Sequence, residues 1–201
     1  MTGVILLFVG AVLLVNGVGS TGKIDVRSMA VMNFMVGGLA LVASLIQLTR
    51  AESNADYFGV ACYFLFTFTY LYVAISMWFE LDMRGFGWFC FFVAITTIPC
   101  SLVAFEGGDN RFGTFWLIWG VLWFMFYLSN VPGKDFGKIM PITVISVGIF
   151  TCWIPAFLIR HSSRVLVNLA FLFCMASLRI CSSERGNTEV RDINSPFSFR
   201  T

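Results

Sequence analysis

Residues 81–95 read LDMRGFGWFCFFVAI, in which a short polar motif, DMRG at 82–85, opens a long apolar run. Two similar motifs, DVRS at 25–28 and DFGK at 135–138, also stand between apolar runs. The three motifs are 57 and 53 residues apart, a spacing that indicates an internal repeat. The pattern predicts an all-α membrane protein made of three pseudo-repeated hairpins, which can enclose a pore if they surround one axis.

The composition also favours a membrane protein. The 201 residues are 58% hydrophobic and 12% charged, whereas soluble domains carry roughly 25% charged residues. The net charge of +2 and the absence of a basic stripe argue against binding of nucleic acid. Uncharged runs of about 18 residues or more are candidates for membrane spans. We expect six spans, at 3–20, 28–48, 57–79, 85–105, 112–130 and 139–159.

The C-terminal part of the chain does not fit the repeat. The six expected helices form one domain over residues 1–160. The segment 161–180 contains an apolar run of 14 residues, 165–178, which is short for a span and predicts an interfacial or packed helix. A seventh span is the alternative. The tail, 181–201, is polar and without periodicity, so we expect it to be disordered.

Basic residues predict the orientation of the chain. The connections that carry the three motifs contain five basic residues: Lys23, Arg27, Arg84, Lys134 and Lys138. The other two connections, 49–56 and 106–111, contain only Arg50 and Arg111. By the positive-inside rule the motif-bearing tips are cytoplasmic and the N-terminus lies outside. The aspartate of each motif suits a helix N-cap.

The positions of the nucleophilic, basic and metal-ligating residue types argue against an enzyme. No nucleophile stands near a base, and the six cysteines have no metal-ligand spacing, so we expect no cofactor, no metal and no disulfide framework. No ionisable residue falls at the middle of a predicted span, which argues against a proton-coupled transporter because such residues mark proton and ion pathways.

Aromatic residues form stripes on two predicted helices. Trp116, Trp119 and Trp123 recur at i, i+3 and i+7 in the fifth span and share one face. Phe66 and Tyr70 are four residues apart in the third span. Tryptophan usually gathers at membrane interfaces, but Trp119 and Trp123 stand near the middle of their span.

The first span adds an apolar stripe that ends in an amide, at Leu6, Val9, Leu13 and Asn16. One interpretation is that these stripes only pack helices together. The other is a narrow slot faced by rings, which suits a small, flat, neutral solute such as urea or acetamide. Such a solute could exchange water for indole N–H, phenol O–H and exposed carbonyl groups, whereas an ion would lose its hydration at a large cost in free energy.

These segments resemble the urea channel and amide transporter family (UreI/AmiS) of bacteria. The matching segments are VMNFMVGGL at 31–39, FTFTYLY at 66–72, LDMRGFGWFCFFVAI at 81–95, WLIWGVLWF at 116–124 and CWIPAF at 152–157. The resemblance covers about residues 1–160. It implies six-helix protomers, each with its own pore, that assemble as a homo-hexamer in the bacterial inner membrane among lipid, with a cytoplasmic urease or amidase as the partner that uses the solute.

The resemblance also implies site residues. The pore constriction of the family maps onto Phe66, Tyr70, Trp119, Leu122 and Trp123. The pore wall maps onto Leu6, Val9 and Leu13, with Asn16 nearby. A glutamate that we expect in the sixth span of urea channels is Val147 here, which favours short aliphatic amides over urea.

The two connections predicted to face outside are short and contain no histidine. Since histidine is the side chain that titrates between pH 5 and 8, we expect a passive channel that is not activated by acid. A coupled small-amide transporter and a non-transporting membrane scaffold are the alternatives.

Overall fold

The computed structural model describes residues 2–158, so the predictions for 161–180 and 181–201 lie outside the described residues. Within residues 2–158 the chain is all helical and has no strand. The α-helices are α1 (Thr2–Gly19), α2 (Val26–Leu48), α3 (Asn54–Trp78), α4 (Arg84–Glu106), α5 (Asn110–Asn130), α6 (Ile139–Val147) and α7 (Ile154–Leu158). A π-helix, η1 (Gly148–Trp153), joins α6 to α7.

The predicted spans agree with these helices. The largest difference in a starting residue is three, between the predicted span at 57–79 and α3 (Asn54–Trp78). The starting residues of the other five spans differ from the prediction by two residues or fewer. Five apolar helices are long enough to cross a membrane if Ile139–Leu158 is taken as one stretch, and Gly3–Gly19 is a shorter apolar helix. Large apolar side chains such as Phe34, Met35 and Phe157 are more than 60% exposed, as lipid-facing residues are. The chain is a multi-pass membrane protein.

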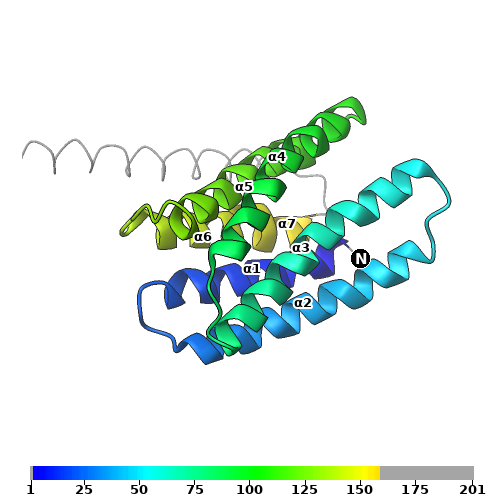
Figure 1. Cartoon of the computed structure of the whole chain (residues 1–201). Helices are drawn as coiled ribbons and strands as arrows, with labels where there is room; N and C mark the ends of the chain where they lie inside the picture. The colour runs from blue at the N-terminus through cyan, green and yellow to red at the C-terminus, as the bar shows by residue number, and fades with distance from the viewer. Residues whose placement is uncertain (1, 159–201) are drawn as a thin grey trace, which may run out of the picture.

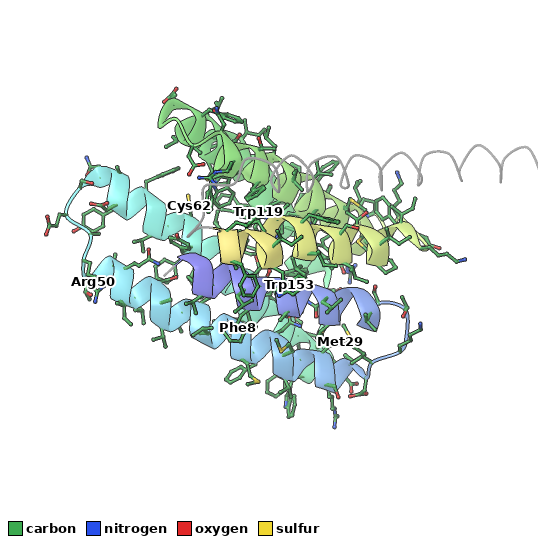
Figure 2. All side chains as sticks on the ribbon, turned by 180° about the vertical axis from the view of Figure 1, so that it is seen from behind. Phe8, Met29, Arg50, Cys62, Trp119 and Trp153 are labelled. Atoms are coloured by element: carbon green, nitrogen blue, oxygen red, sulfur yellow. The ribbon has the colours of Figure 1, made fainter. Side chains whose placement is uncertain are left out.

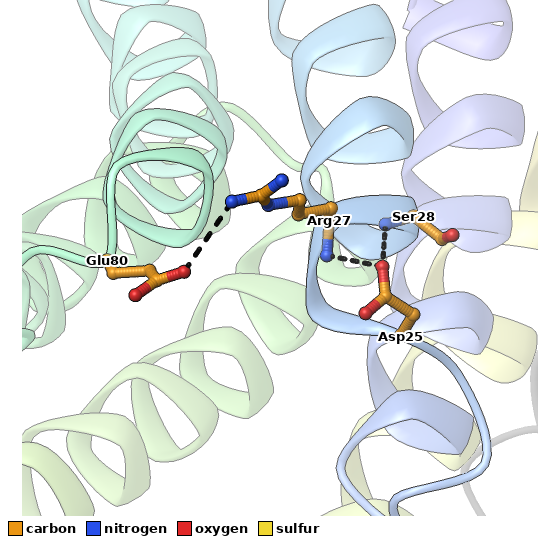
Figure 3. A network of polar contacts seen from close by, with 4 residues as sticks. All are labelled: Asp25, Arg27, Ser28 and Glu80. Atoms are coloured by element: carbon orange, nitrogen blue, oxygen red, sulfur yellow. Dashed lines mark hydrogen bonds and ion pairs between the residues drawn. The ribbon is translucent and has the colours of Figure 1, made fainter.

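The aspartate of each polar motif accepts a hydrogen bond from a backbone N–H two residues further on. Asp25 caps α2, where its Oδ2 accepts from Arg27 N at 3.0 Å and from Ser28 N at 3.1 Å. The Arg27 side chain also lies 3.7 Å from Glu80 in the loop after α3, so the start of α2 meets the end of α3 here (Figure 3). The predicted capping role is confirmed for Asp25.

The other two aspartates are not N-caps: Asp82 lies two residues before the first residue of α4, and Asp135 lies four residues before that of α6. Asp82 Oδ1 accepts from Arg84 N at 3.0 Å, and Asp135 Oδ1 accepts from Gly137 N at 2.7 Å. The Arg84 side chain donates to Asp82 at 2.6 Å and lowers the pKa of that carboxyl below its usual value. Asp82 therefore stays charged at neutral pH and holds the turn that starts α4.

The helices pack most extensively in pairs that differ from the predicted hairpins. α2 lies along α3 and α4 lies along α5, while α1 packs against α6 and η1 (Figure 1). The predicted partners, α1 with α2, α3 with α4 and α5 with α6, make smaller interfaces. The close pairs α2–α3 and α4–α5 are joined by the short loops 49–53 and 107–109, which hold antiparallel helices close together.

A glycine stands at the closest approach of α1 and η1. A Cβ on Gly10 would lie 2.9 Å from both Cβ and N of Trp153, and a Cβ on Gly148 would lie 2.8 Å from Leu13 Cβ. Small residues let helix backbones approach closely inside a membrane, where there is little hydrophobic drive for helices to associate. This contact fixes the position of α1, and Leu13, which takes part in it, also lines one of the interior cavities described below.

The sixth predicted span is not one regular α-helix. The predicted helix at 139–159 is interrupted by η1, in which the Thr151 hydroxyl donates to the Val147 carbonyl at 2.7 Å. A side chain that bonds into the backbone ladder is a recognised cause of helix distortion. Pro155, which has no N–H, follows directly in α7. The distortion aims Thr151 at the interior of the bundle.

Gly10→Ala should destabilise the protein by about 1–3 kcal/mol, because the added methyl group has no room against the Trp153 backbone. Gly38→Ala is the matched control, since a Cβ there meets nothing within 4 Å and alanine raises helix propensity. Reversible unfolding in mixed detergent micelles measures both. Equal stability of the two variants would show that α1 and η1 do not pack as described.

Candidate functional site

Two cavities lie inside the bundle, one toward each end. The motif-side cavity, of about 250 Å³, opens toward the end that carries the three aspartate motifs and is lined by Asn16, Met29, Tyr70, Trp123 and Met140 among others. The loop-side cavity, of about 240 Å³, opens toward the loops 49–53 and 107–109 and is lined by Leu6, Cys62, Cys100, Phe112 and Trp116 among others. In Figure 2, Met29 and Arg50 lie toward opposite ends of the bundle, with Trp119 between them.

Three residues line both cavities and therefore stand at their junction: Val9, Phe66 and Trp119. The rings of Phe66 and Trp119 meet edge to face, with centroids 5.0 Å apart and an interplanar angle of 87°. The Trp123 ring lies 5.0 Å from Phe66 on the motif side. All four side chains are less than 10% exposed. The junction is thus a cluster of rings closed on one side by a valine of α1.

The indole N–H groups of this cluster are paired with threonines of neighbouring helices. Trp119 Nε1 donates to Thr151 Oγ1 of η1 at 2.8 Å, and Trp123 Nε1 donates to Thr69 Oγ1 of α3 at 3.3 Å. Since these donors are engaged inside the protein, the expectation that indole N–H groups serve a solute is wrong for this conformation. The rings offer their faces and edges to the cavities instead.

Beside the ring cluster, the Tyr70 hydroxyl is the polar group that makes no hydrogen bond within the described residues. Tyr70 is 4% exposed and lines the motif-side cavity next to the ring cluster. None of the hydrogen bonds found among residues 2–158 involves its hydroxyl. A buried phenol needs a partner, so this hydroxyl can donate to or accept from a molecule in the cavity.

An amide pair joins α1 to α2 beside the motif-side cavity. Asn33 Nδ2 donates to Asn16 Oδ1 at 2.7 Å, and Asn16 Nδ2 donates back to Asn33 Oδ1 at 3.1 Å. Asn33 is fully buried and also donates to the Met29 carbonyl at 2.8 Å. Asn16 lines the cavity, and an amide has two N–H donors and an oxygen with two lone pairs. Asn33 therefore orients Asn16 and leaves it bonding capacity toward the cavity.

The structure brings together most of the residues that the sequence singled out. The predicted residues that line the motif-side cavity or the junction are Val9, Leu13, Asn16, Phe66, Tyr70, Trp119, Leu122 and Trp123. Leu6 lines the loop-side cavity. Val147 is buried but lines neither of these two cavities, and its carbonyl accepts from Thr151 instead.

Sequence reasoning missed the polar partners of the site, Asn33, Thr69 and Thr151. Asn33 stands out as the one amide within the apolar segment 31–39, which was a usable signal. Thr69 and Thr151 carry no comparable signal, because threonine is common in spans and each one is identified only by the indole that it meets across the bundle.

Neither cavity carries a formal charge. Among the residues that line them there is no Asp, Glu, Lys, Arg or His, and no group of three His, Cys, Asp or Glu side chains within residues 2–158 could hold a metal ion. Transfer of an isolated ion into such a space costs tens of kcal/mol by Born solvation, whereas a neutral polar molecule loses far less. The site suits uncharged solutes.

A family model described as AmiS/UreI family transporter matches residues 1–162. The chain belongs to the AmiS/UreI family. The acid-activated urea channel of Helicobacter pylori is 37% identical over 189 residues, which cover 79% of this chain and 97% of the relative. A putative amidate substrates transporter protein of Mycolicibacterium smegmatis is 40% identical over 162 residues, which cover 79% of this chain and 76% of the relative.

A solved structure supports the fold of this AmiS/UreI transporter. The crystal structure of the urea channel from H. pylori superposes with a TM-score of 0.74 at 38% identity, and the match covers 80% of this chain and 98% of that chain. The two sequence alignments above differ in length, 189 against 162, although each covers 79% of this chain. The urea channel of H. pylori therefore carries residues that have no counterpart here.

Thr151→Val should destabilise this family member by about 1–2 kcal/mol, because the nearly isosteric change leaves the buried Trp119 N–H without an acceptor. Thr96→Val is the matched control, since Thr96 is only half-buried and bonds only to the Phe92 carbonyl of its own helix. Unfolding in mixed micelles measures the difference. If the two variants lose the same stability, the Trp119–Thr151 bond does not hold the ring cluster.

Proposed function

We propose that this protein is a passive channel that conducts urea and short aliphatic amides into the cytoplasm. The observation that carries the proposal is the pair of uncharged cavities that meet at one aromatic junction. The constriction is formed by Phe66, Tyr70, Trp119, Leu122 and Trp123. Leu6, Val9, Leu13 and Asn16 form the wall on α1. Val147 accepts a hydrogen bond from Thr151, which in turn accepts one from Trp119 of the constriction.

The chemistry of the lining explains the choice of solute. A planar amide fits between ring faces and can keep part of its hydrogen bonding through the Tyr70 hydroxyl and the free capacity of Asn16. The family relatives named as a urea channel and an amidate transporter agree with such a solute. No covalent step and no cofactor is needed, because selection rests on the cost of dehydration alone.

Passive transport follows from the lack of charge along the path. Coupling to protons or ions normally uses carboxylates, histidines or lysines inside the membrane, and the linings of the two cavities have none. Charged solutes are excluded for the same reason, without a charged filter.

We further propose how the channel sits in the bacterial inner membrane. The basic residues in and beside the three motifs favour a cytoplasmic location for that end, in which case the motif-side cavity opens inward and the loop-side cavity opens outward. The six spans then surround the path as three related pairs. We also propose a homo-hexamer and a cytoplasmic urease or amidase as the user of the solute, and these two points rest on the family resemblance alone.

The short loops support a channel that acid does not activate. The loops 49–53 and 107–109 contain no histidine, and the longer alignment with the acid-activated relative places extra residues in that relative. Histidine is the usual switch between pH 5 and 8. Amide flux should therefore change less than twofold between external pH 7 and pH 5, as measured by stopped-flow swelling of proteoliposomes. A steep rise at pH 5 would contradict the proposal.

Tyr70→Phe should lower the flux of urea and acetamide severalfold, because the constriction loses its one open hydroxyl. Tyr72→Phe is the matched control, two residues further along α3 and outside both cavities. Unchanged flux in a folded Tyr70→Phe variant would remove Tyr70 from the site.

Trp123→Ala should widen the constriction and raise the flux of larger amides such as butyramide relative to acetamide, while the protomer stays folded. The same swelling assay measures the ratio. An unchanged ratio would rule out Trp123 as a size filter.

The function itself is tested by flux into liposomes with and without imposed proton and sodium gradients. The proposal expects facilitated urea and acetamide flux that does not depend on either gradient. Dependence on a gradient would identify a coupled transporter, and absence of any facilitated flux would identify a scaffold.

A further inference from the structure

Two cysteine thiols face each other in the wall of the loop-side cavity. Cys62 of α3 and Cys100 of α4 lie with their Sγ atoms 3.3 Å apart, and both line that cavity. Figure 2 shows Cys62 toward the end of the bundle that carries Arg50. The other cysteines of the described residues, Cys90 and Cys152, are fully buried and line neither cavity. Cys62 and Cys100 are thus the pair that a small reagent can reach.

We propose that Cys62 and Cys100 form a redox-sensitive dithiol whose oxidation to a disulfide ties α3 to α4 and slows permeation. A disulfide has a sulfur–sulfur distance of about 2.05 Å, so the two sulfurs need to approach by little more than an ångström. Pro99 directly precedes Cys100 and removes one backbone hydrogen bond from α4. The helix can therefore bend at this point at a low cost.

The oxidation is a thiol–disulfide exchange with a small disulfide or a disulfide-carrying oxidoreductase. The thiolate of one cysteine attacks a sulfur of the oxidant, a mixed disulfide forms and one oxidant sulfur leaves as a thiolate. The second cysteine then displaces the other oxidant sulfur and closes the Cys62–Cys100 bond. Two electrons pass to the oxidant, which leaves as two thiols, and the protons of the two cysteines are released to it or to water.

The expected effect on permeation comes from the position of Cys62. Cys62 lies one helical turn before Phe66, on the same side of α3, and Phe66 belongs to the junction of the two cavities. α3 and α4 share a much smaller interface than α2 and α3. A covalent bond across this small interface restricts α3 beside the junction and draws the cavity wall inward.

The proposed orientation gives the dithiol a source of oxidant. It places the loop-side cavity on the outer face of the membrane, where disulfides form and persist, whereas the cytoplasm keeps thiols reduced. The effect on flux rests on the proposed channel function, but formation of the cross-link does not.

The test uses the full chain in proteoliposomes, treated from outside with bis(2-hydroxyethyl) disulfide, a small neutral disulfide. Peptide mass spectrometry is expected to find the Cys62 and Cys100 peptides joined, with the loss of two hydrogens. Acetamide flux should fall at least threefold and recover after reduction. After oxidation, Cys62→Ser and Cys100→Ser should each keep the flux that the same variant shows untreated. Cys90→Ala is the control, because Cys90 lies in α4 with Cys100 but outside the cavities, and its flux should fall as that of the unmodified protein does.

Three results would overturn the proposal. The first is that Cys62 and Cys100 stay free under oxidant while the control peptides remain intact. The second is that the cross-link forms and flux does not change. The third is that flux falls equally in the Cys62→Ser variant. If the reduced protein conducts nothing, the proposed function fails, while the mass measurement still decides whether the dithiol closes.

Discussion

The hydrogen bond from the Trp119 indole to the Thr151 hydroxyl holds the junction of the two cavities in place. It is 2.8 Å long and joins α5 to η1 across the interior of the bundle. Thr151 is aimed inward by the π-helical turn, and that turn packs backbone to backbone against α1 through Gly10 and Gly148. The position of Val9 on the other side of the junction therefore depends on the same contact. Loss of this bond would free the ring that both cavities share.

The uncharged lining determines which solutes the junction admits. An ion would lose tens of kcal/mol of hydration there, and one hydrogen bond from Tyr70 or Asn16 contributes only about 0.5–1.5 kcal/mol, so no arrangement of these groups offsets the loss. A neutral amide without any partner loses roughly 2–7 kcal/mol, which a few hydrogen bonds and ring contacts can offset. The magnitudes favour neutral, planar solutes without any charged filter.

The helices could be predicted from sequence because long uncharged runs have one stable arrangement in a bilayer. The inward faces of α3 and α5 were also predictable, since Phe66 and Tyr70, and likewise Trp119 and Trp123, are four residues apart and share a side of their helices. The pairing of the helices was not predictable from the sequence, because it depends on close approach at glycines such as Gly10. The partners of the indoles were not predictable either. Thr151 lies 32 residues from Trp119, and the π-helical turn that aims it has no clear sequence signal.

Side-specific labelling of α1 shows whether two separate cavities meet inside the bundle. Single cysteines at positions 6 and 13 in an otherwise cysteine-free chain, in sealed vesicles of known orientation, report which cavity each position lines. We expect a charged, impermeant thiol reagent to reach position 6 only from the side of the loops 49–53 and 107–109, and position 13 only from the side of the three motifs. Labelling of both positions from the same side, or of either position from both sides, would contradict two cavities that meet at Val9, Phe66 and Trp119.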